Sequence, residues 1–430
     1  MAINILQGDC IESLNKLEDQ SINTCITSPP YWGLRDYGTA EWDGGDINCD
    51  HKVGRETRGG LSDKQKTTKG SFGDEAIKNN QPCLKCGAIR KDSQLGLEET
   101  PEEFVENLVN VFKEVKRVLR DDGTVWLNLG DTYSSHKDCK STAQSLAKGT
   151  QAEVAHVIDK GRSVSRNTKK LKQAGLKNKD LIGIPWRVAL ALQADGWYLR
   201  QDIIWHKPNP MPESVKDRCT KAHEYIFLLS KKPKYYYDHE AIKEDAKYPQ
   251  GPNSPQSIKK GKGEFGMDTR GGLSKIGAID KKNKRSVWKV STKPFKGAHF
   301  ATFPKDLIEP CVLAGCPEKM CCECGTPYKR QMQKTGEFQR RWSKTIATAE
   351  GSPHEGQSSM QNIYEDLGLQ KQCDCQTNET KAGTVLDPFG GSGTTGIVAA
   401  QHNRNAVLLE LNQEYIDLAK ERINKEVDND

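Results

Sequence analysis

The chain has 430 residues, of which 35% are hydrophobic and 28% are charged, and its formal net charge is +6. This composition excludes a disordered chain and permits one large domain or two to three smaller ones. No apolar run is long enough to span a bilayer, and the N-terminal residues lack the pattern of a signal peptide, so the sequence predicts a cytoplasmic protein without membrane contact. In a reducing compartment, its 14 cysteines are expected to be thiols or metal ligands.

The N-terminal residues alternate between strand and helix patterns. Residues 3–9 and 22–27 read as strands, and residues 10–17 between them read as a helix. The second strand runs directly into the sequence Ser28-Pro29-Pro30-Tyr31. Because proline is disfavoured inside a strand and fixes its own φ, the strand should end at Ser28 in a rigid turn.

The alternation of strands and helices continues to the C-terminus. Thr100-Pro101-Glu102-Glu103 is a capping box with proline at the first helical position, and apolar residues three and four apart extend that helix toward Gly123. Later strands are expected at 124–131, 197–207, 223–231, 384–387 and 405–412, and later helices at 184–196, 303–315 and 413–427. This order favours an α/β fold with a mostly parallel sheet.

A glycine-rich turn follows the strand that ends at Asp387. Gly391, Gly393 and Gly396 form a G-x-G-x-x-G pattern between a strand and a helix, and Glu410 ends the next strand, where a carboxylate can accept hydrogen bonds from ribose hydroxyls. No lysine follows the glycines, and an acid at the strand tip repels a pyrophosphate. The pattern therefore favours S-adenosylmethionine, with a nicotinamide dinucleotide as the alternative.

The double-proline turn supplies the complementary chemistry. The Ser28 hydroxyl and the Pro29 carbonyl can both accept hydrogen bonds from an NH₂ group, and the ring of Tyr31 offers a face for stacking and for attraction to a sulfonium. An aromatic exocyclic amine fits these groups, so the sequence points to a nucleobase as the substrate.

These motifs resemble those of the DNA amino-methyltransferases, which methylate N4 of cytosine or N6 of adenine. "TSPPYW" resembles their catalytic motif and "LDPFGGSGTTG" their cofactor motif, and the catalytic motif comes first, as in the permuted beta group. The resemblance implies a Rossmann-like, circularly permuted methyltransferase sheet and direct transfer without a covalent enzyme intermediate. It implies a catalytic role for Ser28, Pro29, Pro30 and Tyr31. It implies cofactor binding by Asp9, Phe303, Pro304, Asp387, Pro388, Phe389, Gly391, Ser392, Gly393, Thr394, Thr395 and Glu410.

The target base and the partners are predicted less directly. Within the resembling family, Ser at the first motif position suggests cytosine N4 and Asp or Asn suggests adenine N6, so Ser28 favours cytosine and leaves adenine open. An amine inside a duplex is hidden, so double-stranded DNA with a flipped-out base is the expected substrate. A cognate restriction endonuclease is a possible partner, and both a monomer and a homodimer stay open. RNA or protein methylation and an inactive DNA-binding relative are the remaining alternatives.

Two groups of cysteines have the composition of closed zinc sites. The first group is Cys49, His51, Cys83 and Cys86, and the second is Cys321, Cys324, Cys373 and Cys375. Each contains a C-x-x-C-G turn, and four protein ligands leave no open position for catalysis. One or two structural zinc ions are therefore expected, which would hold together polar insertions that bury little apolar surface. Cys311 is expected in the core.

Two polar stretches are strongly basic. Residues 134–180 hold 11 Lys and Arg against 4 Asp and Glu, and residues 240–298 hold 14 against 6. The second stretch is the expected target-recognition region, with DNA contact by Lys284, Arg285 and Trp288. The predicted division of the chain is catalytic domain at 1–37, 97–133 and 181–239, zinc-binding insertions at 38–96 and 316–379, a basic insertion at 134–180, recognition at 240–298, and cofactor binding at 299–315 and 380–430.

Overall fold

A computed structural model describes residues 2–33, 41–51, 82–91, 94–134, 175–245, 281–292, 303–342 and 358–427. Within these ranges the main feature is an eight-stranded sheet with the order β1-β16-β15-β2-β5-β7-β6-β10. The strands are β1 (Ile3–Gln7), β16 (Asn405–Glu410), β15 (Thr384–Asp387), β2 (Ile22–Thr27), β5 (Leu119–Leu129), β7 (His223–Ser230), β6 (Tyr198–His206) and β10 (Val287–Lys289). The order places C-terminal β15 and β16 between N-terminal β1 and β2.

Strand directions confirm the predicted mostly parallel sheet. From β1 through β16, β15 and β2 to β5 every pairing is parallel. β7 runs antiparallel to both β5 and β6, and β10 is parallel to β6. β7 is therefore the one reversed strand of this sheet, so its first residues lie at the edge where the other strands end.

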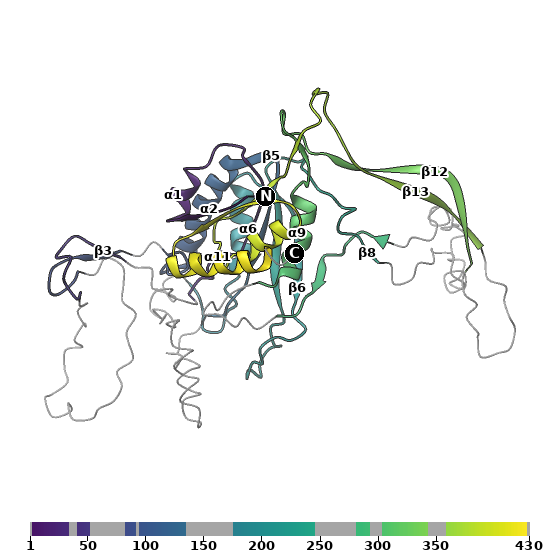
Figure 1. The fold of residues 1–430 in the computed structure, drawn as a ribbon. Helices are drawn as coiled ribbons and strands as arrows, with labels where there is room; N and C mark the ends of the chain where they lie inside the picture. The colour runs from purple at the N-terminus through teal and green to yellow at the C-terminus, as the bar shows by residue number, and fades with distance from the viewer. Residues whose placement is uncertain are drawn as a thin grey trace.

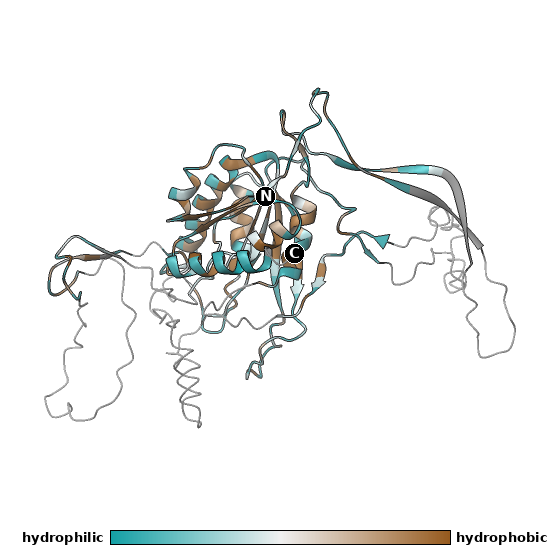
Figure 2. Cartoon of the chain, in the orientation of Figure 1, coloured by the Kyte–Doolittle hydropathy of each residue, from teal (hydrophilic) through white to brown (hydrophobic). Residues whose placement is uncertain are grey.

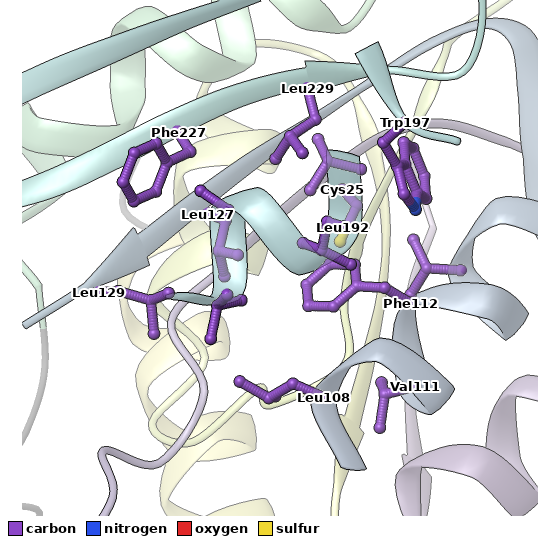
Figure 3. Packing of buried hydrophobic residues seen from close by; sticks show 14 of the residues in the cluster. Cys25, Leu108, Val111, Phe112, Leu127, Leu129, Leu192, Trp197, Phe227 and Leu229 are labelled. Carbon is purple, nitrogen blue, oxygen red and sulfur yellow. The ribbon is translucent and has the colours of Figure 1, made fainter. Parts of the chain in front are cut away.

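Helices cover both faces of the sheet, and each face has its own apolar core. The helices α1 (Cys10–Leu14), α2 (Pro101–Val118) and α6 (Ile184–Ala194) pack with one set of strand residues (Figure 3). The helices α9 (Lys305–Gly315), α10 (Thr394–Gln401) and α11 (Gln413–Val427) pack on the other. Successive strand residues such as Cys25 and Ile26 belong to different cores, because side chains alternate across a strand. Figure 2 shows the apolar residues inside this layered body and polar residues on the outer side of α11.

The ends of the elements follow local chemistry. The predicted capping box is present at α2, where the Thr100 hydroxyl accepts from the Glu103 N–H and the Glu103 carboxylate accepts from the Thr100 N–H. The helix ends at Val118, and β5 begins at the next residue. The prediction that Gly123 separates them is therefore wrong. Gly123 lies inside the strand, where a Cβ would come within 2.6 Å of Leu119.

Four smaller strand pairs lie outside the main sheet. They are β3 (Glu41–Asp43) with β4 (Ile89–Lys91), β8 (Glu244–Asp245) with β9 (Lys281–Lys282), β11 (Met320–Cys321) with β14 (Thr380–Lys381), and β12 (Lys329–Trp342) with β13 (Ser358–Gln370). The sequence did not predict the β12–β13 hairpin, which projects from the body of the protein (Figure 1). Among the described helices, none combines the length and the apolar character needed to cross a membrane.

Candidate active site

The predicted site residues converge on one edge of the sheet. Asp9, Glu410, Asp387 and Ser28 lie at or just beyond the carboxyl ends of β1, β16, β15 and β2, which are consecutive neighbours. Ligands of open α/β sheets bind outside the carboxyl ends of the strands. The double-proline turn and the glycine turn, more than 350 residues apart in the sequence, thus flank the same part of this edge.

A buried carboxylate joins the two turns. Asp387 is 1% exposed; its Oδ1 accepts from the Thr27 hydroxyl at 2.6 Å, and its Oδ2 accepts from the Thr395 hydroxyl at 2.6 Å. The Phe389 N–H also donates to Oδ1, at 3.1 Å. Burial raises the pKa of Asp387 above its ordinary value, and the three hydrogen bonds partly offset this. Asp387 therefore acts from inside the protein, where it fixes the start of both turns.

Glu410 shapes the glycine turn from the neighbouring strand. Its Oε2 accepts from the Gly391 N–H at 2.8 Å, and its Oε1 accepts from the Asn412 N–H at 2.9 Å. Gly391 and Gly393 have φ values of +51° and +78°, which L side chains rarely adopt. Burial raises the pKa of the Glu410 carboxyl. The carboxylate that the sequence assigned to ribose binding thus also holds the turn in shape.

The hydroxyls of Ser392, Thr394 and Thr395, which are predicted cofactor-binding residues, form hydrogen bonds within the protein. Ser392 and Thr394 are 2% and 5% exposed, and Arg422 of α11 donates to both hydroxyls, at 2.6 and 3.3 Å. Thr395 is fully buried against Asp387. These three side chains are occupied within the protein because the turn must be anchored on a helix and a strand. Gly391 and Phe389 of this turn are partly exposed.

The remaining cofactor candidates have different surroundings. Asp9 is the N-cap of α1. Its Oδ1 accepts hydrogen bonds from the Ile11 and Glu12 N–H groups, so one oxygen of this carboxylate is occupied. Pro388 is buried within the turn. Phe303 and Pro304 precede α9. The last residue of α9, Gly315, lies against the side chains of Thr24 in β2 and Thr124 in β5, which are away from the carboxyl ends of these strands. α9 therefore runs from the site edge toward the opposite edge, with Phe303 at the site end.

Tyr31 packs closely against the backbone at the end of β5. A Cβ on Gly130 would come within 2.5 Å of the Tyr31 ring, and one on Gly96 within 3.1 Å of its carbonyl oxygen. The Gly33 N–H donates to the Gly96 carbonyl at 2.8 Å, and the Trp32 indole donates to the Glu98 carbonyl at 2.9 Å. Burial, followed by the nearby Glu224 charge, raises the pKa of Tyr31, so the phenol stays neutral.

Sequence reasoning missed the polar residues around the Tyr31 hydroxyl. Tyr31 donates its hydroxyl hydrogen to Glu224 of β7, and Asn128 of β5 and Lys207 after β6 both contact the same carboxylate. Arg422, which anchors the glycine turn, was also missed. The available signal was a charged or amide side chain inside an otherwise apolar strand, as Asn128 and Glu224 are.

Trp288, a predicted DNA contact, is largely buried in the fold. Trp288 lies in β10, an edge strand of the main sheet, and is 6% exposed with its indole packed near Trp126. Its N–H donates to the Arg285 carbonyl at 2.7 Å. Lys284 lies 5.1 Å from the Trp288 ring centroid, and Arg285 pairs with Glu244 at 2.5 Å. Val287, Trp288 and Lys289 form a strand too short to show a clear periodicity, so region 240–298 contributes to the sheet as well.

Both cysteine groups assemble as the sequence predicted. In each group the four ligand atoms lie within 4.8 Å of one another. The Cys49 and Cys83 sulfurs are 3.8 Å apart, which is about the edge of a tetrahedron with zinc–sulfur bonds of about 2.3 Å. Gly87 and Gly325, with φ of +75° and +69°, close the two C-x-x-C-G turns through hydrogen bonds to the first cysteine's carbonyl.

The two groups lie where insertions begin and end. Cys83 and Cys86 precede β4, and Cys49 and His51 follow β3. Cys321 and Cys324 precede β12, and Cys373 and Cys375 follow β13, so the second group lies at the open end of the long hairpin. Cys311 is buried in the core, as expected. A surface groove of about 520 Å³ between α2 and α6 contains no predicted site residue.

Comparison with known proteins identifies relatives over almost the whole chain. A family described as DNA methylase matches residues 22–321 and 374–421. Type II methyltransferase M.Cfr9I of Citrobacter freundii is 35% identical over 98% of this chain and 88% of its own length. M.SmaI of Serratia marcescens is 35% identical over 97% and 90%. The solved structure of the cytosine-N4-specific PvuII DNA methyltransferase aligns with a TM-score of 0.45 and 14% identity, covering 100% of this chain and 92% of that one.

Substitution of Asp387 tests the hydrogen bonds that connect the double-proline turn and the glycine turn. Asp387→Ala leaves two hydroxyls and one N–H without their buried acceptor and should lower the free energy of unfolding by about 3 kcal/mol. Asp387→Asn keeps an oxygen for Thr27 and removes a buried charge. Because burial raises the pKa of Asp387, the wild type loses stability as pH rises through that pKa, whereas the Asn variant does not.

Urea unfolding at pH 5 and pH 8 measures this difference. The stability of Asp387→Asn relative to wild type should increase at the higher pH, and Asp387→Ala should be the least stable protein at both values. A relative stability of Asp387→Asn that falls with rising pH would contradict the buried-carboxylate account.

Proposed function

The chain belongs to the DNA methylase family, and from this premise we propose that it transfers the methyl group of S-adenosylmethionine to N4 of cytosine in double-stranded DNA. Methylation of adenine N6 by the same site is the alternative. The observation that carries the proposal is the Thr27–Asp387 hydrogen bond, which holds the double-proline turn next to the glycine turn. A methyl donor on one turn can then face an amine on the other.

The residues along the strand edge fit the proposed cofactor. Glu410 and Asp9 are carboxylates at adjacent strand ends and suit the hydroxyl and amine donors of an adenosine, and the partly exposed Phe389 offers an apolar surface. When bound, S-adenosylmethionine supplies an electrophilic methyl group on a sulfonium. Arg422, a basic residue that contacts the glycine turn, donates to Ser392 inside the protein, so this guanidinium is not available to a phosphate-bearing cofactor.

The double-proline turn is proposed to hold the amine. Ser28 and the Pro29 carbonyl accept hydrogen bonds from the exocyclic NH₂, which directs its lone pair toward the donor, and the Tyr31 ring stacks on the base. The contribution of these residues is orientation and exclusion of water, since direct transfer needs no nucleophile from the protein. Extraction of the base from the duplex costs a few kcal/mol, which stacking and phosphate contacts offset.

Ser28 favours cytosine as the target base. Within the resembling family, Ser at this position suggests N4 methylation of cytosine, and Asp or Asn suggests N6 methylation of adenine. The named relatives are type II methyltransferases. We therefore further propose that the protein modifies DNA within a restriction–modification system.

We also propose that both cysteine groups hold structural zinc. The observations behind this are the four converging ligand atoms in each group and the two glycine-closed turns. With four protein ligands, neither ion would have an open position for substrate. Each would instead fix the base of an insertion that has little apolar surface of its own.

Nucleoside mass spectrometry tests the activity. DNA from cells expressing the protein should contain N4-methylcytosine, and DNA from cells expressing Tyr31→Ala should lack it, because the variant has no ring on which to stack the base. Calorimetry should give nearly the same affinity for S-adenosylmethionine in both proteins. N6-methyladenine instead would support the alternative base, and the absence of either modified base would overturn the proposed function.

Metal analysis tests the zinc sites. Protein purified without chelator should contain about two zinc ions per chain, and Cys86→Ser and Cys324→Ser should each lose one and melt at a lower temperature. Cys219→Ser is the matched control, since Cys219 is exposed and outside both groups. A metal-free wild-type protein with an unchanged melting temperature would contradict this assignment.

A further inference from the structure

The hydroxyl of Tyr31 is fixed by a carboxylate on the reversed strand of the sheet. It donates to Glu224 Oε2 at 2.7 Å and lies 3.2 Å from Asn128 Oδ1. Glu224 is the second residue of β7. Because β7 runs against its neighbours, this N-terminal residue lies at the edge where β2 and β5 end. The reversal of one strand thus places a carboxylate directly behind the double-proline turn.

The carboxylate is itself held on both oxygens. Oε1 forms an ion pair with Lys207, and Oε2 also lies 3.4 Å from the Asn128 amide nitrogen. The side chains of Glu224 and Lys207 are 15% and 19% exposed, so the pair is partly shielded from water. Lys207 also lies 4.2 Å from the Trp205 ring centroid. These contacts restrict rotation of the carboxylate and give Tyr31 a fixed acceptor.

Backbone also restricts the Tyr31 ring. Gly130, at the end of β5, lets the ring approach so closely that an added Cβ would lie 2.5 Å from it. The ring is therefore restricted by this close backbone contact and by the hydrogen bond of its hydroxyl. Without these contacts, a tyrosine side chain would rotate about χ1 and χ2.

We propose that Glu224, held by Lys207, is a positioning residue that sets the angle of the Tyr31 ring for stacking on the target base. This inference rests on the function proposed above and concerns how its site is organised. A hydrogen bond to a charged acceptor stabilises a geometry enough to change a rate about 10- to 100-fold. A carboxylate that stays behind the phenol acts through the ring and does not touch the base.

Other charged groups lie around Glu224. Besides Lys207, the Lys221 side chain lies nearby; its nitrogen is buried without a hydrogen-bond partner among the described residues, and burial lowers its pKa. Asp131 lies in the same group, with its Oδ1 accepting from the Gly183 and Ile184 N–H groups at the start of α6. Lys207 therefore pairs with Glu224, whereas Lys221 lies near both Asp131 and Glu224.

A double-mutant cycle tests the proposal. Tyr31→Phe keeps the ring and removes the hydroxyl, and Glu224→Gln keeps the size of the side chain and removes its charge. Each should slow single-turnover methyl transfer about 10- to 100-fold, with S-adenosylmethionine affinity and the shape of the pH profile unchanged. The double variant should be no slower than the slower single variant, because both changes weaken or remove the Tyr31–Glu224 hydrogen bond. Tyr235→Phe, which loses a contact with Arg200 at the opposite edge, is the control and should retain the wild-type rate.

Other results overturn the proposal in identifiable ways. If the two effects multiply, or if Glu224→Gln alone shifts the pH profile, Glu224 acts directly on the reaction and not through Tyr31. Should Glu224→Gln fail to fold, a wild-type transfer rate in Tyr31→Phe would by itself refute the proposal. The same cycle can be measured on unfolding free energies, which needs no activity. An inactive wild type would overturn the proposed function, and additive unfolding free energies of the two variants would refute the coupling of Tyr31 and Glu224.

Discussion

The site depends on one buried hydrogen-bonded carboxylate. Asp387 ends one strand, accepts from the last residue of the neighbouring strand and accepts from the helix that follows the glycine turn. Each of these bonds lies in the protein interior, where a lost acceptor is costly. The two turns therefore cannot separate without exposing or leaving unpaired several polar groups. The burial of this charge is itself unfavourable, which indicates that the geometry of the turns is maintained at some cost to stability.

Other charged side chains fix the glycine turn and the double-proline turn in the same way. Arg422 holds the hydroxyls of the glycine turn, Glu410 holds its backbone, and Glu224 holds the phenol of the double-proline turn. In each case a charged side chain from a neighbouring helix or strand fixes an irregular segment that lacks its own repeating hydrogen bonds. The surfaces that face a ligand are then largely backbone and ring faces, whose positions are set from behind.

The sequence predicted the regular elements and the grouping of the motifs well, because both follow from local patterns. The capping box at Thr100, the two turns and the two cysteine groups all depend on residue type and spacing. The strand that contains Trp288 was not predicted, because a three-residue edge strand within a basic stretch has little periodicity. The β12–β13 hairpin was missed because its strands are polar. The roles of Glu224 and Arg422 were missed because they depend on contacts between distant segments. A charge in an apolar strand marks Glu224 locally but does not identify its partner.

A crystal structure with bound S-adenosylmethionine would test the central claim most directly. The account predicts that the adenosine lies along the ends of β1 and β16, near Asp9 and Glu410, with the methyl group directed toward the turn of Ser28 to Tyr31. The Thr27–Asp387–Thr395 hydrogen bonds should be unchanged. A cofactor bound away from these strand ends, or with its methyl group directed away from the double-proline turn, would contradict the account.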